Sequence, residues 1–217
     1  MVNEINYIAI EGVIGVGKTS LARLIAEKMR ARLILEKFEE NPFLDKFYKS
    51  KADFAFQTQM FFLVSRYKQL EGLHQNSLFT NFIVSDYIFE KDRIFASINL
   101  SDEEFRLYDS IYPMFSQNIR KPDLVIFLDS DVDRLVYNVK LRNREMEKAV
   151  TADYLAALSN AYKEFFFKYS HSPLLIINTT GIDFVNNDSE FNALCKEIFR
   201  KDRAFIEYFN PEGKGIF

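Results

Sequence analysis

The segment Gly12-Val13-Ile14-Gly15-Val16-Gly17-Lys18-Thr19 fits the pattern G-x-x-x-x-G-K-[ST], whose residue types and spacing suit the binding of phosphate groups. Its glycines allow the backbone to wrap around an anion, and a helix beginning at Lys18 adds the positive end of its dipole. We expect Lys18 to reach the β and γ phosphates of a nucleoside triphosphate, and the Thr19 hydroxyl to bind Mg²⁺, a cation that prefers oxygen ligands. The predicted phosphate-binding residues are Gly12, Gly15, Val16, Gly17, Lys18, Thr19 and Ser20.

Such a loop needs a strand before it and a helix after it, and the sequence supplies both. Apolar runs alternate with helical segments along the chain, which is the pattern of a parallel sheet with helices on both faces. We therefore predict an α/β fold with a five-stranded parallel sheet. The predicted strands are Tyr7 to Ile10, Leu33 to Leu35, Phe82 to Val84, Leu124 to Leu128 and Leu174 to Ile177, and the predicted helices span about 19–30, 52–74, 102–118, 131–147, 152–169 and 188–203.

The composition limits the class of protein. With 217 residues, 48% of them hydrophobic, the chain suits a single domain, which we place at residues 1–205 with a C-terminal tail at 206–217. The one cysteine, Cys195, excludes an internal disulfide framework and suits a reducing compartment. The first strand begins close to Met1 and no apolar run is long enough for a bilayer, so we expect a cytoplasmic protein without a membrane segment. The 28 basic and 31 acidic residues argue against a nucleic-acid partner.

A phosphate-binding loop alone does not distinguish a GTPase from an ATPase or a small-molecule kinase. The chain lacks the N-K-x-D motif that guanine-specific switches commonly use to read the base. It has instead a basic cluster with Arg142 and Arg144 after a late helix. In an arbitrary chain such a cluster is usually a solvated helix face. In a chain that binds a triphosphate, two arginines on a moving segment would neutralise the charge on the transferring phosphoryl group.

Several motifs in the same order resemble the deoxynucleoside kinases, and within them the small bacterial deoxyadenosine and deoxyguanosine kinase type. They are the segment Glu36 to Tyr48, the long helical segment Phe56 to Leu70, and Arg142-Asn143-Arg144-Glu145-Met146-Glu147, which fits the family's R-x-R-x-x-E. The resemblance runs from the phosphate-binding loop to Phe184. It implies a P-loop kinase fold with a helical lid at about 138–150, and transfer of the γ-phosphoryl group of ATP to the 5′-hydroxyl of a deoxyribonucleoside, with purine bases favoured.

The resemblance also implies roles for single residues. Glu36, at the carboxyl end of a strand, would be the general base that takes the proton from the 5′-hydroxyl. Glu39 and Glu40 lie nearby, and we prefer Glu36 because its strand-end position agrees with the family register. Gln59 and Arg66 lie seven residues apart and share one helix face, and they would bind the nucleobase. The other residues assigned to the nucleoside by analogy are Phe62, at the base, and Tyr48 and Glu147, at the sugar 3′-hydroxyl.

One motif departs from the family pattern. Most deoxynucleoside kinases have an acidic residue followed by arginine after the third strand, whereas this chain has Ser85-Asp86-Tyr87. An ungapped comparison places Ser85 at the position of the acid, and a shift by one residue places Asp86 there. We prefer the shift, because the strand beside a phosphate-binding loop needs a carboxylate near Mg²⁺. Asp86 would then serve the metal with Thr19 and border the nucleoside, while Asp129, at the end of an apolar strand, is the alternative carboxylate.

Neither comparison restores the family's arginine. Its positive charge near the 5′-hydroxyl would come from Lys91 or Arg93 on the following segment, or would go unreplaced. Near the C-terminus, Asn178 to Phe184 resembles the loop that packs on the adenine of ATP, and Asp183 and Phe184 are the expected contacts. The phenylalanine-rich segment 52–74 has more apolar surface than one sheet face needs, which predicts a homodimer, as in the family.

Two other functions stay open at this point. One is a nucleoside monophosphate kinase similar to thymidylate kinase, although its acceptor phosphate would need an additional cation near the acidic Glu36 segment. The other is a nucleotide-binding relative without activity, which the missing pair of acid and arginine suggests.

Overall fold

The computed structural model describes residues 5–74 and 82–211 of the chain. Its centre is a parallel sheet of six strands in the order β2-β3-β1-β4-β5-β6. The central strands β1 and β4 are buried almost throughout, as expected where helices cover both faces. The strands are β1 (Tyr7–Gly12), β2 (Arg32–Ile34), β3 (Ile83–Ser85), β4 (Leu124–Asp129), β5 (Leu174–Asn178) and β6 (Ile206–Phe209).

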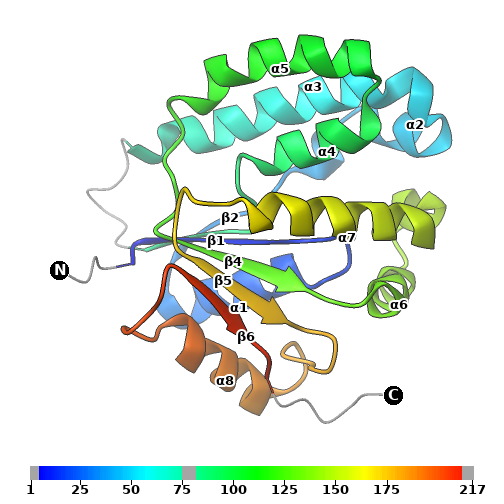
Figure 1. Cartoon of the computed structure of the whole chain (residues 1–217). Coiled ribbons are helices and arrows are strands. Elements are labelled where there is room, and N and C mark those ends of the chain that lie inside the picture. Colours follow the sequence, from blue (N-terminus) through cyan, green and yellow to red (C-terminus); the bar gives the residue numbers. More distant parts are fainter. Residues whose placement is uncertain (1–4, 75–81, 212–217) are drawn as a thin grey trace.

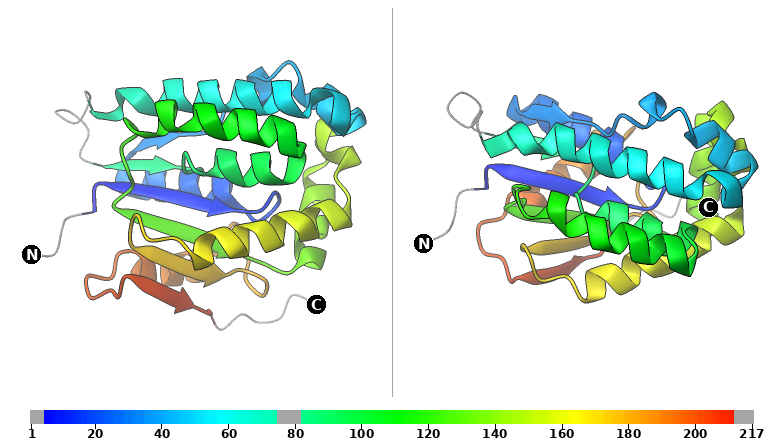
Figure 2. Two further views of the ribbon diagram at one scale, coloured as in Figure 1. Left: turned by 45° about the horizontal axis from the view of Figure 1, so that its top comes forward. Right: turned by 90° about the horizontal axis from the view of Figure 1, so that it is seen from above.

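Helices form a layer on each face of the sheet (Figure 1). The views in Figure 2 place α1 and α8 on one face, and α4 and α7 with α3 and α5 on the other. The helices are α1 (Lys18–Met29), α2 (Leu44–Lys49), α3 (Lys51–Leu70), α4 (Lys91–Asn99), α5 (Asp102–Ser116), α6 (Val132–Arg142), α7 (Ala152–Phe167) and α8 (Asp188–Ile198), and short 3₁₀ helices lie at Phe38–Glu40, Glu71–His74 and Glu145–Ala149.

Side-chain hydrogen bonds cap the first turns of α5 and α7, whereas α1 begins without such a cap. Ser101 accepts a hydrogen bond from the Glu104 N–H, and the Glu104 carboxylate accepts one from the Ser101 N–H, which is a capping box at the start of α5. At the start of α7 the Thr151 hydroxyl oxygen accepts a hydrogen bond from the Tyr154 N–H. By contrast, α1 follows Gly17 and has no side-chain cap, so its first N–H groups are open to an anion.

The α/β class and the parallel sheet are confirmed, and the number of strands is corrected from five to six. Ile206–Phe209, which the sequence assigned to a tail, forms β6 and pairs with β5. Because it is a short edge strand with exposed Ile206 and Tyr208 side chains, its pattern did not indicate burial. Residues 212–217 of the predicted tail lie outside the described residues.

Helix boundaries differ from the prediction mainly in the lid. The predicted helix 131–147 ends as α6 at Arg142, because Asn143 adopts a left-handed φ of 48°. Glu145–Ala149 then form a separate 3₁₀ helix, so Arg144 lies at a bend. The prediction also lacked α2 and α4. The first turn of α4 buries charged Lys91, which apolar periodicity does not reveal.

The strand order brings distant polar residues to one edge of the sheet. From β1 the chain passes to β2 and β3 on one side and then to β4 on the other, so the direction of connection switches beside β1. Ligands of such sheets bind at the carboxyl ends of the strands near this switch. Gly12 ends β1, Glu36 follows β2, and Asp86 follows β3. These residues therefore meet at one site.

Candidate active site

The loop between β1 and α1 packs so closely that a side chain is excluded at Gly15 and at Gly17. Gly15 and Gly17 adopt left-handed φ values of 89° and 101°. A Cβ on Gly15 would lie 2.9 Å from the Leu135 backbone oxygen, and one on Gly17 would lie 2.8 Å from the Phe184 ring. Lys18 donates a hydrogen bond of 3.0 Å to the Val13 carbonyl, which holds its ammonium over the loop.

Asp86 connects the loop with the end of β2. Its Oδ2 accepts a hydrogen bond of 2.6 Å from the Thr19 hydroxyl, and its Oδ1 accepts one of 2.8 Å from the Glu36 N–H. Ser85, the alternative at this position, is fully buried and its hydroxyl donates to the Tyr87 carbonyl. The carboxylate beside Thr19 is therefore that of Asp86.

Asp129 lies elsewhere at the carboxyl edge. It ends β4 and forms an ion pair of 3.3 Å with Lys163 of α7. Its carboxylate also accepts a hydrogen bond from the Ser130 N–H. Asp129 is absent from the described lining of the pocket that holds Thr19 and Asp86. The geometry thus separates the two candidate carboxylates, and only Asp86 faces the phosphate-binding loop.

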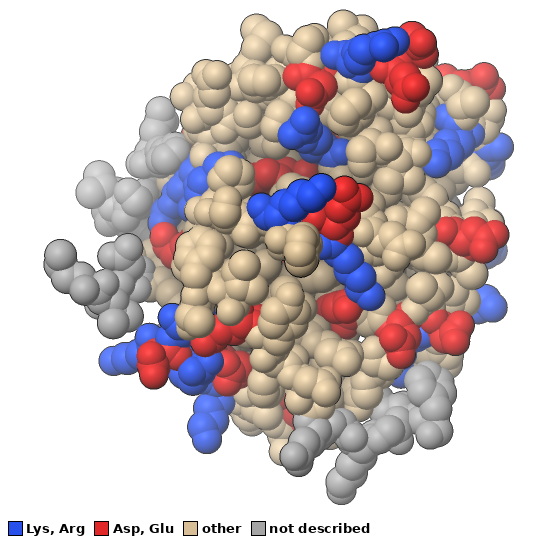
Figure 3. Space-filling model, in the orientation of Figure 1, with Lys and Arg blue, Asp and Glu red and all other residues tan. Residues whose placement is uncertain are grey.

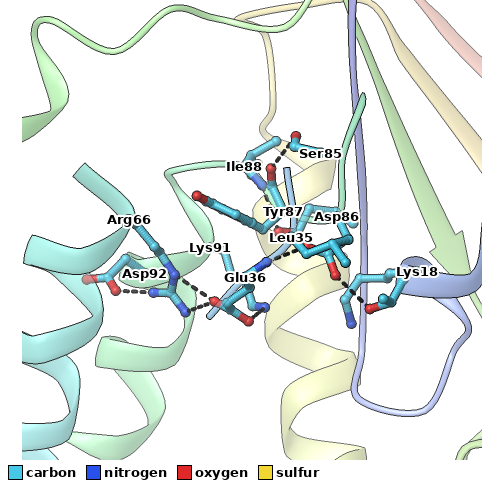
Figure 4. A network of polar contacts seen from close by, with 12 residues as sticks. Lys18, Leu35, Glu36, Arg66, Ser85, Asp86, Tyr87, Ile88, Lys91 and Asp92 are labelled. Atoms are coloured by element: carbon cyan, nitrogen blue, oxygen red, sulfur yellow. Dashed lines mark hydrogen bonds and ion pairs between the residues drawn. The ribbon is translucent and has the colours of Figure 1, made fainter. Parts of the chain in front are cut away.

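Glu36 is the acidic centre of the site (Figure 4). Its Oε1 accepts hydrogen bonds from Arg66 Nε and Nη2 at 2.8 and 2.6 Å, and its Oε2 accepts one from Lys91 Nζ at 2.5 Å. Burial by itself would raise the pKa of Glu36, but the cations of Lys91 and Arg66 outweigh it and lower the pKa to about 2. Glu36 is therefore a carboxylate at every physiological pH, with its oxygens held in a fixed direction.

Lys91 and Arg93 were the two candidates for the missing arginine, and the structure separates them. Lys91 is buried at the start of α4 and contacts Glu36, whereas Arg93 is exposed and pairs with Asp109 of α5 at 3.0 Å. Tyr87, at the arginine's position after the shift, is fully buried, and its hydroxyl donates to Gln69. Of these two candidates, Lys91, four residues after Tyr87, is therefore the one that joins Arg66 beside Glu36.

Lys91 also acts on the phosphate side of the site. Burial lowers the pKa of Lys18, and repulsion by Lys91 lowers it further, to about 8, against the opposing effect of Glu11, Asp86 and Glu36. The same ammonium thus influences the acidic group at one side of the pocket and the basic group at the other.

The predicted base-binding residues of α3 both face the site, but they are engaged by protein groups. Gln59 Nε2 donates a hydrogen bond of 2.8 Å to the backbone oxygen of Asp92. Arg66 binds Glu36 through Nε and Nη2 and binds the Asp92 carboxylate through Nη1, while its guanidinium lies 4.7 Å from the Phe62 ring centroid. Contact of Arg66 with a base stays a prediction, whereas its contact with Glu36 is a feature of the structure.

Most of the residues singled out in the sequence line one cavity, which we call the central pocket. It is also lined by Asn99 and Tyr154, whose side chains hydrogen-bond each other over 3.3 Å and which the sequence analysis missed. They stand on α4 and α7, and α4 was not predicted. The residues from the sequence analysis in its lining are Gly15, Lys18, Thr19, Glu36, Tyr48, Gln59, Phe62, Arg66, Asp86, Lys91, Arg142, Arg144 and Glu147.

The two lid arginines are held at the rim of the central pocket by one carboxylate. Arg142 Nη2 lies 2.7 Å from Glu147 Oε2, and Arg144 Nη1 lies 3.5 Å from Glu147 Oε1. The Arg144 guanidinium also lies 4.7 Å from the centroid of the Phe38 ring. Glu147 is buried, so the three charges form a compact cluster facing Tyr48.

A second cavity, the loop pocket, lies on the other side of the phosphate-binding loop. Gly15 and Arg142 line both cavities, so the loop and the lid separate them. Val16, Gly17, Ser20, Asp183 and Phe184 from the sequence analysis line the loop pocket. Phe184 is buried against Gly17, so it supports the loop as well as bordering this cavity.

Sequence reasoning missed the part of the loop pocket that α6 supplies. Arg134, Tyr137 and Asn138 line it, and Asn138 Nδ2 donates a hydrogen bond of 2.9 Å to the Gly15 carbonyl. The sequence predicted only that they belong to the helix 131–147, with Asn138 at the start of the lid segment 138–150. Their spacing on one face of that helix was the available sign.

Comparison with known proteins shows similarity to deoxynucleoside kinases over most of the chain. The family model described as "Deoxynucleoside kinase" matches residues 8–202 of the chain. The chain is 33% identical over 201 residues to a deoxyguanosine kinase of Bacillus subtilis, covering 90% of this chain and 97% of that protein. It is 34% identical over 214 residues to a deoxyadenosine kinase of Dictyostelium discoideum, covering 96% of this chain and 84% of that protein.

A solved structure has the same fold. The deoxyadenosine kinase of M. mycoides with bound dCTP superposes with a TM-score of 0.77 at 24% sequence identity, covering 88% of this chain and 98% of that one. Because the family model spans residues 8–202 and both relatives are more than 30% identical over most of their own length, this chain belongs to the deoxynucleoside kinase family.

Proposed function

We propose that this protein transfers the γ-phosphoryl group of ATP to the 5′-hydroxyl of a deoxyribonucleoside, with purine deoxynucleosides preferred. The observation that carries the proposal is the position of Glu36, which lies in one pocket with Lys18 of the phosphate-binding loop and with Gln59 of α3. The preference for purines is supported by the relatives, which are named as deoxyguanosine and deoxyadenosine kinases. The amide of Gln59 can pair with a donor and an acceptor on a purine edge.

The acceptor would bind in the central pocket with its 5′-hydroxyl at Glu36. Because the pKa of Glu36 is about 2, its carboxylate is a weak base, and it would take the proton only as the O–P bond forms. This suits phosphoryl transfer, in which the transition state is loose and positioning contributes most of the rate. We assign Lys91 the role of steadying the carboxylate and the hydroxyl oxygen, and we assign Tyr48 and Glu147 to the sugar 3′-hydroxyl.

The donor would lie across the loop, with its base in the loop pocket and its phosphates over Lys18 and the loop N–H groups. The groups that would bind Mg²⁺ are the Thr19 hydroxyl and the Asp86 carboxylate, whose oxygens are 2.6 Å apart. Magnesium commonly binds one or two protein oxygens and completes its coordination with water and substrate phosphates, so these two oxygens fit the ion. When bound, Mg²⁺ neutralises phosphate charge and holds the triphosphate in one geometry.

The lid would close at residues 138–150. Arg142 and Arg144 pair with the single negative charge of Glu147 in the structure. A phosphoryl group beneath them would carry more negative charge than this carboxylate and would bind both guanidiniums more strongly. Their movement toward the phosphates would place positive charge where it develops in the transition state and would exclude water. Glu147 would then be free to accept a hydrogen bond from the sugar.

Replacing Asp86 should expose its role with Mg²⁺. We expect Asp86→Asn to raise the Mg²⁺ concentration needed for half-maximal activity and to lower kcat about 100-fold, because one carboxylate near the metal is lost. The matched control is Asp129→Asn, which removes the alternative carboxylate at the same edge of the sheet. Magnesium titrations of the steady-state rate measure both. Equal effects of the two changes would contradict the assignment to Asp86.

An acceptor panel tests the function as a whole. Purified protein with labelled ATP is incubated with the four deoxynucleosides, the ribonucleosides and the deoxynucleoside monophosphates. We expect 5′-monophosphates of the purine deoxynucleosides as the main products. Monophosphates as preferred acceptors would indicate a thymidylate kinase-like activity, which the pairing of Lys91 and Arg66 with carboxylates disfavours. Binding of ATP and nucleoside without any product would indicate an inactive relative.

We also propose that the chain forms a homodimer. The phenylalanines of segment 52–74, which predicted the dimer, are half-buried in α3, and exposed apolar side chains lie on α5, which we place at the interface. Leu107 and Met114 are 52% and 73% exposed and lie seven residues apart, so they share one face of this helix. Sedimentation at micromolar concentration should give twice the mass of the chain. Replacing Leu107 and Met114 together by lysine should give the monomer mass, whereas Tyr208→Lys, at an equally exposed residue on β6, should not. A monomer before any substitution would refute the proposal.

The reducing cytoplasm is our proposed location. Cys195, the one cysteine of the sequence, is buried as a free thiol. Basic and acidic side chains are interspersed over the face shown in Figure 3. This face therefore lacks the continuous basic surface that is typical of nucleic-acid binding. Within residues 5–74 and 82–211, the helices lack the combination of length and apolarity needed to cross a bilayer.

A further inference from the structure

The two residues of α3 that face the acceptor are both anchored to one residue of α4, Asp92. The Asp92 backbone oxygen accepts a hydrogen bond from Gln59 Nε2. The Asp92 Oδ1 binds Arg66 Nη1 (Figure 4). Asp92 is fully buried, and it is absent from the described lining of the central pocket. It therefore acts on the pocket only through the two side chains that it holds.

Asp92 is in turn oriented from a third helix. Its Oδ2 accepts a hydrogen bond of 2.7 Å from the hydroxyl of Tyr108 on α5. Tyr108 is fully buried, and its ring packs against those of Phe105 and Tyr112. Burial and the Asp92 charge raise the pKa of Tyr108 far above its ordinary value, so the hydroxyl keeps its proton and donates at all working pH values.

These contacts form one connected set, which we call the Asp92 cluster: Tyr108, Asp92, Gln59 and Arg66. It links α5, α4 and α3 behind the pocket and ends at Glu36 through Arg66. Without the Tyr108 hydroxyl, Oδ2 of Asp92 would lose its partner in an apolar environment, and the carboxylate would gain freedom to turn. Any such turn would displace Arg66, which the Asp92 carboxylate binds, and through Arg66 it would reach Glu36.

We propose that Tyr108, which does not line the central pocket, is a positioning residue that sets acceptor discrimination by holding the Asp92 carboxylate, and through it Arg66. The inference rests on the proposed function and extends it to a residue about which neither the motifs nor the pocket give any indication. A displacement of a substrate-orienting group by a fraction of an ångström is enough to lower the rate, because reacting atoms must be aligned closely. The loss should be greatest for the acceptor that fits best.

The test compares Tyr108→Phe with Tyr7→Phe in the full chain. Tyr7 is a matched control, because its hydroxyl is also buried and shares a hydrogen bond, with Ser85 Oγ at 3.1 Å, outside the cluster. We expect Tyr108→Phe to lower kcat/KM for the preferred deoxynucleoside roughly tenfold and to reduce its preference over other deoxynucleosides, with the KM for ATP unchanged. Tyr7→Phe should leave the preference unchanged even where its Tm falls as much.

The ratio of kcat/KM for two acceptors, measured on one preparation, decides the question. It does not depend on the fraction of folded enzyme, so it remains valid if Tyr108→Phe folds poorly. An unchanged ratio in Tyr108→Phe, or an equal change in Tyr7→Phe, would overturn the positioning role. Failure of the proposed function would be seen separately, as an unsubstituted protein that phosphorylates no deoxynucleoside.

Discussion

Glu36→Gln should lower kcat about 1,000-fold, since a positioned general base contributes a factor of this order. The amide has nearly the size of the carboxylate but cannot accept the proton of the 5′-hydroxyl. It also leaves Arg66 and Lys91 with one fewer negative partner, and we expect a loss of about 3 kcal/mol in the free energy of unfolding. Steady-state kinetics and thermal unfolding of the same preparation measure both effects.

The KM for ATP separates loss of chemistry from loss of the fold in this variant. Lys18 is held by the Val13 carbonyl and not by a direct bond to Glu36, so ATP binding should persist. Glu40→Gln is the matched control, because Glu40 lies in the same acidic segment but is exposed and pairs with Lys37. Similar losses in the two variants, or an unchanged kcat in Glu36→Gln, would remove Glu36 from the catalytic role.

Lys91→Met should lower kcat about 100-fold, the effect expected when one charged group aimed at the reacting oxygens is removed. The methionine side chain keeps most of the volume of lysine, so the cavity left behind is small. Lys91→Arg should restore part of the activity, because the guanidinium again pairs with Glu36. Arg93→Met serves as control, since Arg93 is exposed and pairs with Asp109. If Arg93→Met lowered kcat as much as Lys91→Met, the assignment of the replacing cation would be wrong.

The pH dependence gives Lys91→Met a specific signature. In the unchanged protein Lys91 and Arg66 lower the pKa of Glu36 to about 2, so its carboxylate form is lost only as the pH falls through that value. Without Lys91, burial is opposed by Arg66 alone, and the pKa rises. The activity is then lost at a higher pH as the medium is acidified, which the acid side of the kcat/KM profile for the nucleoside measures.

The alkaline side of the profile should move in the same direction. The pKa of Lys18 is lowered to about 8 by burial and by Lys91, so kcat/KM for ATP should fall as the pH rises through about 8 in the unchanged protein. Removing Lys91 raises the pKa of Lys18 and moves this fall to higher pH. If the acid side of the nucleoside profile and the alkaline side of the ATP profile both shift to higher pH in Lys91→Met, one ammonium acts on both Glu36 and Lys18. Movement of neither side would argue against it.

The site was predictable where it depends on neighbours in the chain. The phosphate-binding loop consists of consecutive residues, and its glycines, Lys18 and Thr19 have backbone conformations set locally. The Gln59 and Arg66 pair was predicted to share a face because a helix has a known period. The family resemblance added roles for Glu36 and the lid arginines, and the structure places these residues around one pocket.

The elements that were not predicted contain charged residues that are buried or apolar residues that are exposed. Lys91 and Asp92 are charged and yet buried, so apolar periodicity gave no sign of α4. Ile206–Phe209 has little buried surface of its own, and it becomes a strand only because β5 offers a free edge for pairing. In each case the deciding interaction comes from a segment distant in the sequence.

By itself, the sequence determined the glycine-rich loop between β1 and α1 and the alternation of strands and helices, because both are encoded by residue types at short spacing. Tertiary structure alone decided which of Lys91 and Arg93 lies beside Glu36. It also decided which of Asp86 and Asp129 faces Thr19, and that Arg66 is held between Glu36 and Asp92. The physical reason is that these contacts join separate elements, and only the order of strands in the folded sheet brings their side chains within reach of one another.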